Sequence, residues 1–148
     1  MPPKYTHTVC SKDEGGNGLN ENGASKLSFL GVDGVFMPVS DLTRSVRWYT
    51  EVLGLEIRHR DEPHAAVLKI GQGLPALCLV QSGGPLPAPF PPNRYDVTHF
   101  FNFKAADIDA VHSELAARGV DVSPIYQSDA LRYFGFQDPD GNGLGVVN

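Results

Sequence analysis

The sequence is poor in cysteine, in basic residues relative to acidic ones, and in long apolar runs. Its two cysteines, Cys10 and Cys78, are too few and too far apart for a disulfide framework or a zinc cluster. Acidic residues outnumber Lys and Arg by 17 to 12. The resulting net charge of −5 leaves no basic face for nucleic acid or an anionic membrane.

No apolar run reaches the length of a transmembrane helix, and no basic segment followed by an apolar one marks a secretory signal. We therefore expect a cytoplasmic protein with no nucleic-acid and no membrane partner. Hydrophobic residues make up 41% of the 148 residues, which is enough for a single globular domain. Residues 1–26 are rich in Gly and polar residues and predict a disordered or loosely attached tail. Residues 27–148 then form the domain.

The first half of that domain predicts one strand, one helix and three further strands. Val32 to Val39 is a short apolar run typical of a strand. Ser40-Asp41 caps a helix whose inner face carries apolar residues at helical spacing, with Ser45 off that face. The helix ends before Gly54. The three strands follow over residues 55–60, 64–70 and 76–81.

The second half repeats this order. Residues 97–105 predict a strand, residues 107–119 a helix, and residues 120–126, 131–137 and 143–147 three more strands. The modules span residues 30–82 and 95–148, and a Pro-rich linker over residues 83–92 joins them. The repeat predicts an α+β fold, in which two βαβββ modules pair into a cup-shaped mixed β-sheet with the helices outside.

Several short motifs in this order resemble the vicinal oxygen chelate superfamily, which includes glyoxalase I, extradiol dioxygenases and bleomycin-binding proteins. The motifs are Asp41-Leu42, Trp48-Tyr49 and Leu53-Gly54-Leu55 in the first module, and Asp107-Ile108-Asp109, Gly119 and the Asp138 to Asn142 turn in the second. The resemblance implies a divalent metal, held in the cup by His, Gln or Glu from the first and last strand of each module. It also implies a homodimer, because members of this length commonly pair so that modules complete each other's cups.

The four positions that would hold this metal carry Gly34, Cys78, Phe100 and Gly145. One thiol does not hold a catalytic divalent ion, so we predict no metal and no cofactor. His99 is adjacent to Phe100, but alternation along a strand points it to the opposite face unless a β-bulge re-aims it.

The same alternation predicts an apolar, aromatic cup lined by small residues, which is the composition of a small-molecule cleft. The predicted ligand-binding residues are Phe36, Pro38, Cys78, Phe100, Asn102, Arg132 and Tyr133. No catalytic residue is assigned.

We expect a metal-independent small-molecule-binding protein of the bleomycin-resistance type that sequesters an apolar or aromatic ligand. The alternatives are a glyoxalase-like lyase or isomerase, or a dioxygenase-related enzyme with an atypical site. A structural domain whose cup is filled by its own side chains is a third.

Overall fold

The computed structural model describes residue 19, residues 21–23 and residues 27–148. The tail predicted over residues 1–26 therefore lies almost wholly outside the described residues. The first module contains β1 (Gly34–Val39), α1 (Leu42–Glu51), β2 (Glu56–Asp61), β3 (Ala65–Lys69) and β4 (Ala76–Gln81). The second contains β5 (Asn102–Lys104), α2 (Ile108–Ala117), β6 (Tyr126–Ser128), β7 (Leu131–Gln137) and β8 (Gly143–Val147).

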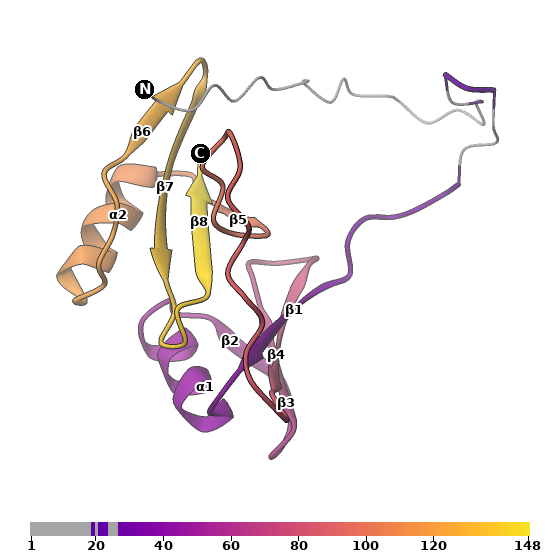
Figure 1. Cartoon of the computed structure of the whole chain (residues 1–148), viewed down its shortest axis with the longest axis vertical. Helices are drawn as coiled ribbons and strands as arrows, with labels where there is room; N and C mark the ends of the chain where they lie inside the picture. The colour runs from indigo at the N-terminus through magenta and orange to yellow at the C-terminus, as the bar shows by residue number, and fades with distance from the viewer. Residues whose placement is uncertain (1–18, 20, 24–26) are drawn as a thin grey trace.

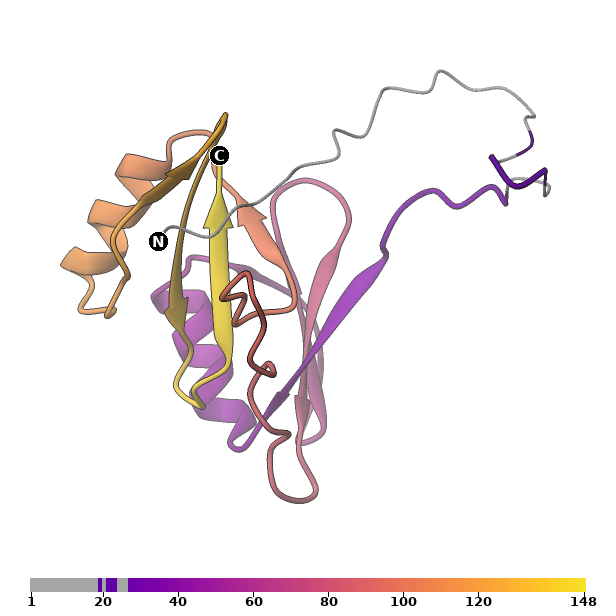
Figure 2. The same ribbon diagram turned by 45° about the horizontal axis from the view of Figure 1, so that its top comes forward.

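Each module folds into its own four-stranded mixed sheet (Figure 1). The strand orders are β1-β4-β3-β2 and β5-β8-β7-β6, so the two sheets have the same topology. In each sheet the first and last strands pair in parallel and the remaining neighbours pair antiparallel. The predicted α+β fold of two βαβββ modules is confirmed. The connector between β4 and β5 passes in front of β8, between the two sheets (Figure 2).

Both helices begin and end where local chemistry predicts. Asp41 and Asp107 are the N-caps, and each side-chain Oδ1 accepts a backbone N–H three residues later. Gly54 and Gly119 follow the helices with φ of +70° and +82°, a conformation that is costly for other residues. The prediction for Ser45 is wrong, because its side chain is fully buried on the inner face of α1.

One hydrophobic core runs through both modules. Its buried side chains include Met37 and Val39 from β1 and Phe134 and Phe136 from β7. The even-numbered residues of β7 and the odd-numbered residues of β1 therefore face inward. This leaves the other face of each sheet to form the cup.

Hydrogen bonds from the turn between β7 and β8 connect the second module to the first. Asp140 accepts hydrogen bonds from the Ser40 backbone N–H (2.9 Å), the Ser40 hydroxyl and the Arg44 guanidinium (2.6 Å). The Tyr49 hydroxyl donates to Asp138 at 2.9 Å, and the Asn142 amide donates to the Pro38 carbonyl at 3.0 Å. The sequence predicts only a chain reversal at this turn, and it does not predict these hydrogen bonds between the modules.

Two of the predicted strands are much shorter than expected. Residues 97–101 do not pair as a strand, because they cross over β8: a Cβ added at Gly143 would overlap the Thr98 carbonyl. Residues 120–125 are also irregular. There Ser123 bonds Gly135 through both its backbone N–H and its hydroxyl, each at 2.9 Å, in place of a regular ladder.

Candidate ligand-binding site

A cavity of about 880 Å³ lies over the second sheet. Its floor is the face of β7 opposite the core, where Tyr133, Gly135 and Gln137 alternate. Gly135 has no side chain, and it pairs with Gly145 of β8, which has none either. Gly135 leaves the floor low at its own position, whereas other side chains fill the space above Gly145.

One wall of the cavity is the loop over residues 91–97, which Asn93 organises. The side-chain oxygen of Asn93 accepts the backbone N–H groups of Tyr95 (3.0 Å) and Val97 (3.2 Å). Its amide nitrogen donates to the carbonyls of Pro91 (3.1 Å) and Val97 (2.9 Å). This fourfold bonding holds Tyr95 and Asp96 at the cavity. Asp96 has φ +55°, a left-handed conformation that Asp and Asn tolerate better than most residues.

The opposite wall comes from the segment over residues 121–124 and from β6. The Ser123 carbonyl accepts a hydrogen bond from His112 Nε2 of α2 at 2.8 Å, so the segment is held from the helix side as well as from β7. Tyr126 of β6 lies beside Tyr133, with ring centroids 5.7 Å apart. Aromatic surface therefore borders the cavity from three separate segments.

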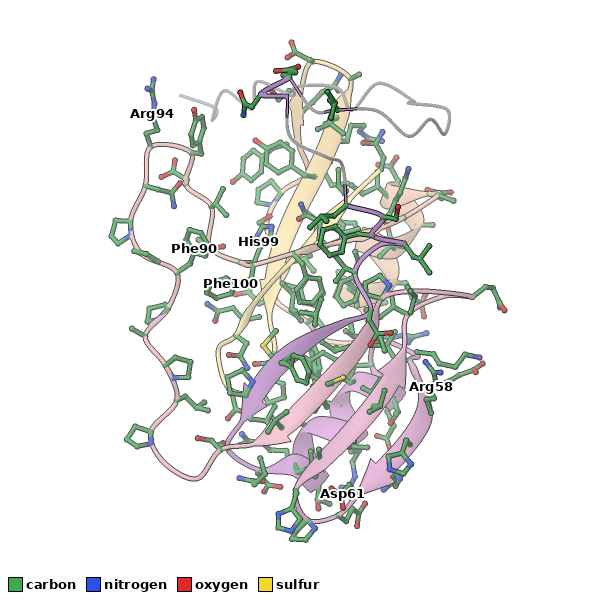
Figure 3. The ribbon with its side chains drawn as sticks, turned by 90° about the vertical axis from the view of Figure 1, so that its right-hand side faces the viewer. Arg58, Asp61, Phe90, Arg94, His99 and Phe100 are labelled. Atoms are coloured by element: carbon green, nitrogen blue, oxygen red, sulfur yellow. The ribbon has the colours of Figure 1, made fainter. Side chains whose placement is uncertain are left out.

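His99 lies in this cavity, and the prediction that it points to the opposite face is wrong. Its Nε2 lies 2.6 Å from Asn102 Oδ1, and a Cβ added at Gly145 would overlap both side chains. His99 is therefore on the same face as Asn102, above β8 (Figure 3). The alternation argument failed because β5 begins only at Asn102.

The protonation of His99 follows from its surroundings. An amide oxygen only accepts hydrogen bonds, so Nε2 carries the hydrogen and Nδ1 is the acceptor. Burial lowers the pKa of His99, and the hydrogen bond with Asn102 opposes this shift only in part. The imidazole is therefore neutral at pH 7. Nδ1 is buried, with no hydrogen-bond partner among the described residues.

The residues present do not fit the divalent metal that the resemblance implies. Gly34 and Gly145 offer no donor atom, and the space above Gly145 is occupied by His99 and Asn102. Cys78 lies beside Gly34 on the first sheet, where burial, followed by the charge of Asp33, raises the pKa of its thiol. A protonated thiol is a poor metal ligand. No group of three or more His, Cys, Asp or Glu side chains comes together within the described part of the chain.

Three of the predicted ligand-binding residues, Phe36, Pro38 and Phe100, lie in a second groove of about 580 Å³. Phe100 lies against Phe90 of the connector, with ring centroids 5.0 Å apart (Figure 3). Phe36 and Phe100 remain 74% and 75% exposed, so neither serves as core filling. Thr98 and Gln137 line both this groove and the cavity over the second sheet, so the two lie side by side.

The other predicted residues divide between different places. Tyr133 lines the cavity, and Asn102 supports His99 from β5. Arg132 points the other way, toward α2, where its guanidinium makes two hydrogen bonds to Asp109 at 2.6 and 2.8 Å. The sequence analysis did not identify four residues that line the cavity, namely Tyr95, Asp96, Asp121 and Tyr126. A sequence signal for two of them was available, because polar and aromatic residues cluster directly after the prolines, in Asn93-Arg94-Tyr95-Asp96.

The sequence model of the Glyoxalase/Bleomycin resistance protein/Dioxygenase superfamily matches residues 31–146. The chain belongs to this superfamily. No curated protein matches it in sequence. No helix in the described part of the chain is long and apolar enough to cross a membrane.

Solved structures share the fold of this superfamily member at low sequence identity. Integron cassette protein HFX_CASS4, from the mobile metagenome of the Halifax Harbour sewage outfall, is 22% identical with a TM-score of 0.67, covering 80% of this chain and 98% of that one. TnmS3, an antibiotic-binding protein from Streptomyces sp. CB03234, is 22% identical with a TM-score of 0.65, covering 82% and 97%. Lactoylglutathione lyase from Agrobacterium tumefaciens is 21% identical with a TM-score of 0.62, covering 80% and 92%.

Proposed function

We propose that this superfamily member is a metal-independent binding protein for an apolar or aromatic small molecule. The observation that carries the proposal is the cavity of about 880 Å³ over the second sheet, in which three tyrosines surround a floor that is low at Gly135. Clefts of roughly 300–1,000 Å³ lined by aromatic side chains and a few polar groups are typical of small-molecule sites. The neutral polar side chains of Thr98 and Gln137, which also line the cavity, supply the orienting hydrogen bonds.

Aromatic walls favour a flat ligand. Ring pairs at centroid distances of about 4.5–7 Å contribute roughly 0.5–1.5 kcal/mol beyond the burial of their area. Tyr126 and Tyr133 already lie at such a distance from each other, with their ring planes tilted by 34°, so a planar ligand beside either ring gains a contact of the same kind. The antibiotic-binding protein TnmS3 has the same fold, which makes sequestration of a compound an activity this scaffold supports.

A glyoxalase-like lyase or isomerase, or a dioxygenase-related enzyme with an atypical site, is the second candidate. The observation that favours it is the imidazole of His99, which lies in the cup after all. The lactoylglutathione lyase of A. tumefaciens shares the fold. The available donor atoms argue against this second candidate. A catalytic ion needs three protein ligands, and the residues present offer one imidazole, which is bonded to Asn102, and one protonated thiol.

The test fills the cavity floor with a larger side chain. Gly135→Leu places a branched side chain where a ligand would lie, and a Cβ there meets only the Leu144 carbonyl at 3.5 Å, an ordinary contact. We expect it to abolish binding of the neutral tricyclic compound acridine, measured by fluorescence titration. Gly73→Leu is the matched control, because Gly73 lies in a turn with nothing within 4 Å of an added Cβ.

Two outcomes of this experiment would contradict the proposal. One is the failure of the unmodified protein to bind acridine or any of its charged derivatives. The other is unchanged binding in folded Gly135→Leu. Tyr133→Ala provides a second variant that opens the cavity rather than filling it, and we expect it to weaken acridine binding about threefold to tenfold through the lost ring contact.

A further inference from the structure

The charged side chains that line the cavity over the second sheet in the described part of the chain are both acidic. Asp96 and Asp121 line it, and no Lys or Arg stands among its described lining residues. The two carboxylates come from separate loops, one on each wall. Within the described residues, neither makes an ion pair or a side-chain hydrogen bond. No described residue therefore neutralises their charge through an ion pair.

No other described group in the lining offsets these carboxylates. His99 is neutral at pH 7, because burial lowers its pKa. The chain as a whole carries a net charge of −5, which adds a weak long-range field of the same sign. An anionic ligand entering this cavity would meet two carboxylates and no cation.

The tyrosines suit the same ligand charge. The face of an aromatic ring carries negative electrostatic potential and attracts a cation within about 6 Å of its centroid. The protein already uses Tyr95 in this way, since Arg94 Cζ lies 5.7 Å from the centroid of that ring. Arg94 itself stands at the tip of the loop and points away from the body of the protein (Figure 3). The rings of Tyr126 and Tyr133 border the cavity directly.

We infer that the ligand of this cavity is a positively charged aromatic compound, a planar ring system bearing an amine or amidine. This inference rests on the proposed function and adds the ligand's charge to it. The rings stack on the tyrosines while the cationic group lies between the carboxylates of Asp96 and Asp121. The two loops thereby select cations over neutral and anionic compounds of the same shape.

The test compares three tricyclic probes of one shape at pH 7.5: 9-aminoacridine, which is cationic, acridine, which is neutral, and acridine-9-carboxylate, which is anionic. We expect 9-aminoacridine to bind about tenfold or more tighter than acridine, and the carboxylate to bind weakest. The preference for the cation should shrink as NaCl is raised, because salt screens exposed charges.

The matched variants are Asp96→Asn, Asp121→Asn and, as the control, Asp129→Asn. Asp129 is outside the cavity lining and has φ +49°, close to the +55° of Asp96, so the backbone cost of Asn is the same at both positions. All three changes alter the net charge equally. We expect the first two to weaken 9-aminoacridine binding about threefold to tenfold each and to leave acridine binding unchanged. Asp129→Asn should leave the binding of all three probes unchanged.

The outcomes separate the two proposals. Equal binding of the three probes, or equal effects of the Asp96 and Asp129 changes, overturns the cationic ligand and leaves the binding function standing. Binding of none of the probes overturns the binding function itself. Tightest binding of the carboxylate overturns the charge assignment directly.

Discussion

The His99 imidazole and the Asn102 side chain lie against each other above Gly145, with Nε2 2.6 Å from Oδ1. The resemblance to metal-binding members of the superfamily implies the last metal ligand at the position of Gly145. Here the residue is glycine, and the side chains of His99, just before β5, and of Asn102 in β5 fill the space above it. The cup of the second module is therefore organised by a hydrogen bond between two side chains.

This relationship predicts a strong effect of Gly145→Ala. The added Cβ would overlap both side chains, so His99 and Asn102 must move. We expect a loss of about 1–3 kcal/mol in the free energy of unfolding, measured by urea denaturation, as for other overpacked sites. In a His99→Ala background the loss should be smaller, because one of the two obstacles is gone. Equal losses in both backgrounds would contradict the arrangement.

The buried hydrogen bond between the modules predicts a cost for Tyr49→Phe. The change removes the donor to Asp138 and leaves a buried carboxylate oxygen with one partner fewer. We expect a loss of about 1–3 kcal/mol by urea denaturation. Tyr126→Phe is the control, since that ring is exposed and should change stability by less than about 0.5 kcal/mol.

The Asp140 contacts predict a dependence of stability on acid pH. Burial raises the pKa of Asp140, but hydrogen bonds from Ser40 and the charge of Arg44 outweigh it, so the pKa is lowered on folding. Because the pKa is lower in the folded protein, the ionised carboxylate stabilises the fold at pH values above its ordinary pKa of about 4. This stabilisation is lost as the pH falls through the lowered pKa. Asp140→Asn should flatten the acid limb of a plot of unfolding free energy against pH. An acid limb of the same slope in Asp140→Asn would contradict this role of Asp140.

The exposed face of the first sheet predicts a homodimer. Phe36 is 74% exposed and Val80 37% exposed on this face, which also carries Cys78. Exposed apolar surface of this kind is typical of protein interfaces. Light scattering at tens of micromolar should give twice the mass of the chain, and Phe36→Ser should shift the protein toward monomer. A monomeric mass for the unmodified protein would contradict this prediction.

The regular parts of the fold could be predicted from the sequence because their signals are local. Apolar periodicity, the caps Asp41 and Asp107, and the glycines after each helix place the elements to within a few residues. The bounds of β4, β7 and β8 agree with the prediction. The candidate site was harder, because it lies on irregular segments whose path depends on tertiary contacts.

His99 illustrates the difficulty. Alternation holds only within a paired strand, and pairing at β5 begins five residues later than the apolar pattern indicates. The chain crosses above Gly143 and Gly145, and the space that permits this crossing is visible only when the two segments are placed together. Asp96 was missed because it belongs to a loop that no periodic pattern marks, and Asp121 because residues 120–126 predict a regular strand where the chain is irregular.

The most direct test of metal-independent binding is an acridine titration of the protein before and after exhaustive dialysis against EDTA, with the metal content measured in both samples. The account predicts one site per chain, the same affinity in both titrations, and loss of binding in Gly135→Leu. Binding that disappears with EDTA and returns only when Zn²⁺, Ni²⁺ or Fe²⁺ is restored would contradict it.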